Sequence, residues 1–335
     1  MKALFTVLIL LIAAVQGNTQ DRLPIIDMHM HAFPADQQGP PPLALCSPME
    51  EFPAWDQRKP YGEVWMDILK NPTCEDPMWS PETDEELRNQ TIEVMKEHNI
   101  IGMISGTPDF VNTWMNAAPG RFYSGLNFNA ASRRYSVDSV RALYEAGRLD
   151  VLAEITNQYS GMDPTDERMD PYWKMAEELD IPVGIHIGPG PPGVIYLGAT
   201  GYRARLHSPL TLEEVLVKYP RLRVYVMHAG YPMLDDMLAV LYAHPQVYVG
   251  LGVIIFTRPK KDFYRYLERI IDAGFGNRIL FGSDQMVWPE AIERSIETIN
   301  NASFLTEQHK RDIFYNNAAR FLRLSDEEIS AHHGM

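Results

Sequence analysis

The chain has 335 residues, of which 45% are apolar and 22% are charged, so it can bury a large core and lacks the composition of a disordered protein. Its 44 acidic residues outnumber the 30 basic ones, which gives a formal net charge of -14. A chain this acidic would be repelled by a phosphate backbone. We therefore expect no nucleic-acid partner.

The first residues have the pattern of a secretory signal peptide. A lysine at position 2 precedes an apolar stretch from Ala3 to Val15. Small residues lie at and just after the end of this stretch, at Ala14 and Gly17. This stretch is shorter than the roughly 20 residues that span a bilayer. We expect residues 1–17 to be removed, the mature protein to be exported to the periplasm or the extracellular space, and no stable membrane insertion.

Residues 34–81 differ in composition from the rest of the chain. They contain ten prolines and three of the six tryptophans, with little periodicity. Because so many aromatic side chains would not remain solvated, we predict an ordered insertion. The only two cysteines, Cys46 and Cys74, lie in this segment, and the sequence leaves open whether they form a disulfide.

The remainder of the chain alternates short apolar segments with helical patterns. Expected strands cover residues 25–28, 100–105, 122–128, 151–156, 183–187, 222–227, 247–251 and 279–281. Expected helices cover residues 82–98, 109–118, 136–147, 170–179, 210–218, 233–242, 262–273, 289–300 and 306–321. Strands this short and apolar are typical of a parallel sheet that helices cover on both faces.

Eight such strands predict an α/β protein with a single (β/α)8 barrel of the TIM type. A doubly wound sheet is disfavoured because no glycine-rich phosphate-binding pattern follows the first strand. We expect the barrel domain to span residues 23–324, with residues 34–81 inserted after the first strand. Residues 325–335 are expected to form a tail.

Histidines and acids stand at the ends of several predicted strands. His29 and His31 lie two residues apart on the first strand and therefore point to the same side, as does Asp27. His186 ends the fifth strand, His228 follows the sixth, and Asp284 follows the eighth. The carboxyl ends of all barrel strands meet at one rim, where the active site of this architecture lies.

This donor set predicts a site for zinc or another divalent ion, with manganese as the alternative. An ion with an open coordination position would lower the pKa of a bound water towards 7. A lone histidine is more often an ordinary core or capping residue, but this explanation is weak for four histidines at strand ends.

On these motifs the sequence resembles the amidohydrolase superfamily, in the amidohydrolase-related branch that also contains metal-dependent decarboxylases and lactone hydrolases. The matching motifs are residues 27–31, His186, His228, residues 282–284 and the closing residues 316–321. The resemblance implies a metal held by His29, His31, His186 and Asp284. It also implies that His228 lies near the metal or polarises the substrate, and that Asp284 takes a proton from the attacking water and passes it to the leaving group.

Two further parts of the site stay open in the sequence. Many superfamily members have a carbamylated lysine on the fourth strand, where this chain offers Glu154, so either one or two metal ions would fit. Asp27 is expected to fix the tautomer of an imidazole from outside the ligand set. Tyr196, Arg203 and Arg205 are candidate substrate-binding residues in the loop after strand five, and Arg258 is a further one after strand seven.

The resulting hypothesis is an exported metal-dependent hydrolase of a small amide, ester or lactone. The alternative with the same site is a nonoxidative decarboxylase of a small unsaturated or aromatic acid. A noncatalytic binding barrel is a third hypothesis, which substitutions at the ligand positions would have favoured. Neither the substrate nor the oligomeric state follows from the sequence.

Overall fold

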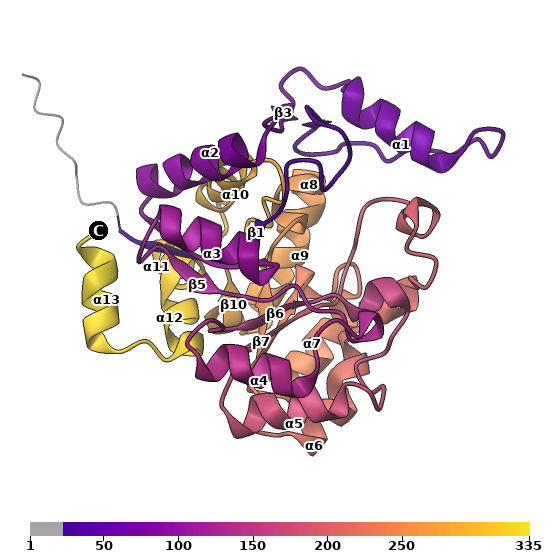
Figure 1. The fold of residues 1–335 in the computed structure, drawn as a ribbon. Coiled ribbons are helices and arrows are strands. Elements are labelled where there is room, and N and C mark those ends of the chain that lie inside the picture. Colours follow the sequence, from indigo (N-terminus) through magenta and orange to yellow (C-terminus); the bar gives the residue numbers. More distant parts are fainter. Residues whose placement is uncertain (1–22) are drawn as a thin grey trace, which may run out of the picture.

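Residues 23–335 are described by a computed structural model, in which eight parallel strands form the centre of the molecule (Figure 1). The expected signal peptide lies outside the described residues. The strands are β1 (Ile25–Ala32), β4 (Ile100–Gly106), β5 (Phe122–Ser124), β6 (Leu152–Ile155), β7 (Val183–His186), β8 (Val224–Met227), β9 (Val247–Gly250) and β10 (Ile279–Leu280). Each coincides with a predicted strand.

Hydrogen bonds close these strands into a barrel. The strand pairing gives one sheet in the order β1-β4-β5 and another in the order β10-β9-β8-β7-β6. Parallel bridges from Gly125 to Val151 and from Phe128 to Ile155 join β5 to β6. At the other seam, the Met28 amide donates to the Phe281 carbonyl over 2.9 Å. The expected barrel is therefore confirmed.

Helices cover the outside of the barrel, as their amphipathic patterns predict. A capping box at Thr83 begins the first helix after the insertion, because the Thr83 side chain accepts from the Glu86 amide and Glu86 binds the Thr83 amide in return. The helices between strands are α2 (Asp84–Glu97), α3 (Pro108–Ala117), α4 (Val137–Glu145), α5 (Asp170–Glu178), α6 (Glu213–Lys218), α7 (Leu234–Ala243), α8 (Ile254–Thr257) and α9 (Lys260–Asp272). None of the helices within residues 23–335 combines the length and apolar character that a membrane crossing requires.

The end of the chain departs in two ways from the sequence expectation. After α10 (Ala291–Asn300), the segment expected as one helix consists of α11 (Glu307–Arg311), a π-helical turn, and α12 (Asn317–Leu322). The segment expected as a tail contains α13 (Asp326–His333), whose His332 Nδ1 lies 3.1 Å from the Tyr315 hydroxyl. This buried contact holds α13 against the barrel.

Apolar side chains fill two layers. The larger cluster lies between the strands and the surrounding helices, and the smaller one includes Ile26, Met28, Met227 and Leu280. The Tyr225 hydroxyl in this smaller cluster donates to the Met28 carbonyl over 2.9 Å, although β8 and β1 are not neighbours. The smaller cluster therefore packs inside the barrel. The carboxyl ends of the strands are left for polar residues.

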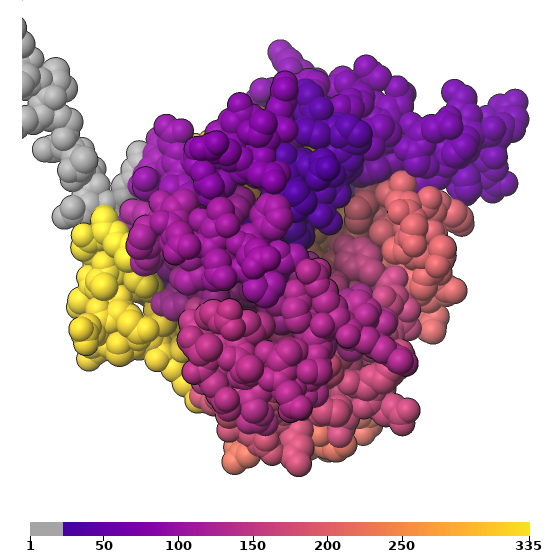
Figure 2. All heavy atoms as spheres, in the orientation of Figure 1, coloured from indigo at the N-terminus to yellow at the C-terminus, as the bar shows by residue number. Residues whose placement is uncertain are grey.

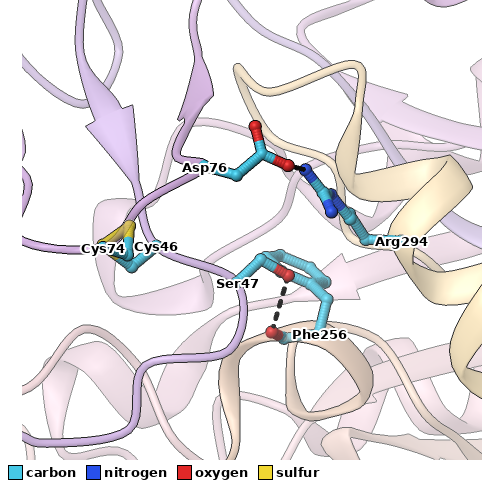
Figure 3. Close-up of a disulfide and its surroundings, with 6 residues drawn as sticks. All are labelled: Cys46, Ser47, Cys74, Asp76, Phe256 and Arg294. Carbon is cyan, nitrogen blue, oxygen red and sulfur yellow. Dashed lines mark hydrogen bonds and ion pairs between the residues drawn. A yellow bond between two sulfur atoms is a disulfide. The ribbon is translucent and has the colours of Figure 1, made fainter.

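The insertion of residues 34–81 is an ordered unit at the rim. It contains β2 (Ala44–Leu45) paired with β3 (Met78–Trp79), and helix α1 (Tyr61–Lys70), which the sequence analysis did not predict. Cys46 and Cys74 form a disulfide (Figure 3). The Ser47 hydroxyl donates to the Phe256 carbonyl over 3.0 Å, and Arg294 forms an ion pair with Asp76. Both ends of the disulfide-closed loop are thus attached to the barrel.

The disulfide generates a first prediction. The bridge closes a sequence separation of 28 residues, so it should add on the order of 3 kcal/mol to the free energy of unfolding by restricting the unfolded chain. Protein purified without reductant should contain no free thiol in a titration under denaturing conditions. Two free thiols per chain would refute the bridge, and unchanged denaturation midpoints in a Cys46→Ser, Cys74→Ser double variant would refute its contribution to stability.

Candidate metal centre

Six buried donor side chains from five strands converge at the carboxyl end of the barrel. His29 and His31 lie on β1, Glu154 on β6 and His186 at the end of β7. The other two follow strands directly: His228 comes after β8 and Asp284 shortly after β10. The structure therefore brings together every residue that the sequence analysis proposed as a ligand.

Glu154 lies at the centre of this cluster. Its Oε2 is 3.8 Å from His29 Nε2 and 3.6 Å from His31 Nε2. Its Oε1 is 2.6 Å from His186 Nδ1 and 3.5 Å from His228 Nε2. The two oxygens of one carboxylate thus face two different pairs of imidazoles.

Asp284 lies on the side of the β1 pair. Its Oδ1 is 3.0 Å from His31 Nε2 and 3.6 Å from His29 Nε2, and its Oδ2 is 3.8 Å from His228 Nδ1. Two pairs of imidazole nitrogens also lie close together. The distance is 3.1 Å between His29 Nε2 and His31 Nε2, and 2.8 Å between His228 Nε2 and His186 Nδ1. Lone pairs directed at a common point are the arrangement of a chelating site.

Burial and the carboxylates have opposing effects on these side chains. Burial lowers the pKa of His186 to about 4, with the neighbouring His228 adding to the effect, and burial also lowers the pKa of His29. Burial alone would raise the pKa of Glu154, but hydrogen bonds to His186, His228 and His29 hold it well below its usual value. The acid therefore stays ionised while at least two imidazoles stay neutral, which are the forms that bind cations.

Neighbouring groups orient the imidazoles. The Ser105 hydroxyl lies 2.9 Å from His31 Nδ1, and His228 Nδ1 donates to the Gly252 carbonyl over 2.9 Å. These contacts leave the Nε2 atoms of both rings facing the cluster. Asp27, expected to fix a tautomer, instead accepts the backbone amides of His29 and Ser283 at 2.9 and 3.0 Å. Asp27 thus joins the backbones of β1 and the β10 segment, and burial raises its pKa to about 6.

Backbone geometry at the cluster is constrained. His228 and Asp284 both have a positive backbone φ angle, 63° and 54°, which residues other than glycine rarely adopt. Gly252 lies so close to the cluster that a Cβ atom there would be 2.5 Å from His29 Nδ1 and 3.0 Å from the Asp284 Cβ. Glycine at position 252 is therefore required for these two side chains to occupy their places.

The cluster fits a divalent metal ion. Three groups have donor atoms that all lie within 4.8 Å of one another: His29, His31 and Glu154; Glu154, His186 and His228; and His29, His228 and Asp284. Neutral imidazoles together with ionised carboxylates suit zinc and other divalent transition ions.

A cavity of about 800 Å³ opens from the cluster between the insertion and the loop after β7. The space-filling view shows the surface hollowed between these two segments (Figure 2). The cavity wall includes the aromatic side chains of Phe33, Phe52, Trp65 and Trp288. Such a cavity accommodates a small molecule with an apolar part.

The candidate substrate-binding residues lie in different surroundings. Tyr196 lines the mouth of the cavity, with its ring 4.7 Å from that of Trp55 in the insertion. Arg203 and Arg205 are exposed and lie outside the cavity lining, and Arg203 binds the carbonyls of Thr200 and Tyr202 within its own loop. Neither arginine faces the cluster.

Among the described residues that line the cavity, Arg258 is the one with a permanently positive side chain. Its guanidinium lies over the rings of Phe52 and Tyr231, at 4.8 and 5.1 Å from their centroids. Its Nε is buried without a hydrogen-bond partner in the described part of the chain, and burial lowers its pKa. Because Arg258 lines the cavity, its guanidinium is a candidate partner for an anionic group there.

The sequence analysis missed two residues of the site. Gln285 exchanges two hydrogen bonds with the backbone of His31, at 3.0 and 2.7 Å. Its place directly after Asp284 could have indicated this role. Tyr159 lines the cavity beside His186, and it lies in a short 3-10 helix that has no sequence periodicity to reveal which way its side chain points.

Comparison with known proteins places the chain in a family. A family model described as amidohydrolase matches residues 26–324, so the chain belongs to the amidohydrolase family, and the resemblance stated above is confirmed. The proteins of this family are enzymes that act on small molecules. No curated protein matches the sequence.

Three solved structures illustrate the likeness in fold. An uncharacterised TIM-barrel protein from Bordetella bronchiseptica has 17% identity and a TM-score of 0.63, covering 93% of this chain and 100% of that chain. A probable 2-pyrone-4,6-dicarboxylic acid hydrolase from Acinetobacter baumannii has 14% identity and a TM-score of 0.58, covering 90% and 99%. A 5-carboxyvanillate decarboxylase from Sphingomonas paucimobilis has 12% identity and a TM-score of 0.55, covering 90% and 100%.

A second prediction concerns metal content. Because six donors converge, the purified protein should contain at least one divalent ion per chain in elemental analysis. Replacing both His29 and His31 by alanine should lower the metal content by at least one ion per chain, since one whole side of the cluster is removed. A wild-type protein that is free of metal and takes up neither zinc nor manganese on titration would contradict the assignment of the site.

A third prediction tests the packing around the cluster. Gly252→Ala should weaken metal binding by about tenfold or more, because the new Cβ must displace His29 or Asp284. Gly62→Ala is the matched control, since a Cβ at Gly62 meets no atom within 4 Å. Equal metal affinity in the two variants would show that the close approach at Gly252 does not position the ligands.

Proposed function

We propose that this protein is a metal-dependent hydrolase that uses two divalent ions, most simply zinc, to cleave a small ester, lactone or amide that carries a carboxylate. The observation that carries the proposal is Glu154, whose Oε2 faces His29 and His31 while its Oε1 faces His186 and His228. A carboxylate with its oxygens divided in this way is placed to bridge two ions.

The residues divide into two ligand groups that share Glu154. His29, His31 and Asp284 would hold one ion, and His186 and His228 the other. Ions bound by these two groups would supply Lewis acidity that lowers the pKa of a water molecule, which would favour hydrolysis. Decarboxylation needs no attacking water, so this arrangement gives it no comparable advantage.

Asp284 is the proposed proton carrier. It is buried beside His29 and His31, and although burial alone would raise the pKa of Asp284, its electrostatic interaction with His29 and the hydrogen bond from His31 hold that pKa below its usual value. The carboxylate is therefore ionised at neutral pH and can accept the proton of the attacking water. The same proton then passes to the leaving oxygen or nitrogen.

Arg258 supports the assignment of a carboxylate on the substrate. It is the cation of the cavity lining, whereas the lining acids, Glu154 and Asp284, belong to the ligand cluster. A carboxylate on the substrate would pair with Arg258 and orient the apolar body between the aromatic walls.

Export is also part of the proposal. Support comes from the pattern of residues 1–17 and from the Cys46–Cys74 disulfide, because disulfides persist mainly in oxidising compartments. A fusion of residues 1–22 to a reporter enzyme that requires export should show activity outside the cytoplasm. Retention of the fused reporter inside the cell would contradict export.

The fourth prediction separates hydrolysis from decarboxylation. The protein should be incubated with esters, lactones and anilides that carry a carboxylate, and with hydroxylated aromatic acids as decarboxylase substrates. Turnover in oxygen-18 water should place the label in the product, and Asp284→Asn should reduce kcat by about a hundredfold or more while leaving the fold intact. Carbon dioxide release without oxygen-18 incorporation would overturn the proposal in favour of decarboxylation.

The fifth prediction tests Arg258 with a matched pair of esters. Wild-type protein should hydrolyse 4-acetoxybenzoate more efficiently than phenyl acetate, which lacks the carboxylate. Arg258→Leu should raise KM for 4-acetoxybenzoate by about tenfold or more and change little for phenyl acetate, since a hydrogen bond to a charged group contributes about 1.5–3 kcal/mol. Equal effects on both esters would assign Arg258 a purely structural role.

A further inference from the structure

Tyr159 is a polar residue of the cavity that the proposed mechanism does not yet use. It lies in the 3-10 helix Asn157–Ser160, which directly follows the strand that carries Glu154. Its ring centroid is 4.7 Å from that of His186, so the side chain stands beside the ligand cluster. It also lines the cavity, so the side chain is accessible to a bound molecule.

The loop after β7 fixes the position of the phenol. A Cβ atom on Gly190 would lie 2.9 Å from the Tyr159 hydroxyl oxygen and equally close to a ring carbon. The backbone of this loop therefore packs against the end of the side chain, and no larger residue at position 190 would fit without moving it. The Tyr159 hydroxyl therefore lies next to the loop backbone at one wall of the cavity.

The Tyr159 hydroxyl differs from that of its neighbour Tyr202. The two rings are 5.7 Å apart. The Tyr202 hydroxyl donates to the Gly188 carbonyl at 3.0 Å, accepts from the Gly190 amide at 3.1 Å, and lies 2.5 Å from His207 Nε2. Within residues 23–335, the Tyr159 hydroxyl makes no hydrogen bond. The Tyr202 hydroxyl is therefore engaged in hydrogen bonds within the protein, whereas the Tyr159 hydroxyl is available to a molecule in the cavity.

We propose that the Tyr159 hydroxyl donates a hydrogen bond to the substrate oxygen on which negative charge develops during the reaction. A positioned neutral donor beside the reacting carbonyl stabilises the transition state more than the ground state. This inference rests on the proposed function, because it assigns the oxygen to the carbonyl that is hydrolysed. It adds Tyr159 to the catalytic residues.

The test compares Tyr159→Phe with Tyr202→Phe as a matched control, both loaded with the same metal. Tyr159→Phe should leave the Tm and the metal content unchanged, since the hydroxyl has no partner in the protein. With 4-acetoxybenzoate it should lower kcat by about a hundredfold and change KM by less than about threefold. Tyr202→Phe should lower the Tm by a few degrees, because it removes hydrogen bonds within the fold.

A binding measurement separates this inference from the proposed function. 4-Carboxyphenylboronic acid takes up hydroxide to form a tetrahedral anion that resembles a hydrolytic intermediate. Its Kd, measured by calorimetry, should be at least tenfold weaker for Tyr159→Phe than for wild type. If wild type hydrolyses no ester but this difference in Kd is found, the proposed function fails and the role of Tyr159 as an oxyanion donor stands. An unchanged Kd together with an unchanged kcat, or a fall in Tm equal to that of Tyr202→Phe, would overturn the inference.

Discussion

The structure of the rim depends on the contact between the Glu154 carboxylate and four imidazoles. A buried carboxylate is costly unless charge or hydrogen bonds compensate it. Here the compensation comes from His29, His31, His186 and His228, which three other parts of the barrel deliver to the same point. Because parallel strands all end at one rim, a barrel can gather donors that are distant in sequence into one buried cluster. The second carboxylate, Asp284, enters the same cluster.

The insertion forms part of the cavity wall at this rim. Its residues Phe52 and Trp65 contribute apolar surface beside the cluster. The disulfide loop also places Phe52 over the Arg258 guanidinium, so the cation is oriented by stacking. The cavity therefore has the cluster of imidazoles and carboxylates at one end, aromatic side chains in its wall and the Arg258 guanidinium in its lining.

Much of the fold could be predicted from the sequence because short apolar strands and donor residues at their ends are local patterns. Helix α1 was missed because prolines surround it and obscure its periodicity. The division of the Glu154 oxygens between two pairs of imidazoles depends on the positions of four strands, which no local pattern contains. The same limit applies to the arginines: only backbone geometry decides that Arg258 enters the cavity while Arg203 and Arg205 remain in solvent.

The central claim is that Glu154 joins two metal ions in one site. Electron paramagnetic resonance of the manganese-loaded protein tests it most directly, because two ions about 3.5–4 Å apart couple magnetically. The account predicts two manganese ions per chain with an exchange-coupled spectrum, which Glu154→Gln converts to the six-line spectrum of isolated ions. One ion per chain and a six-line spectrum already in the wild-type protein would contradict it.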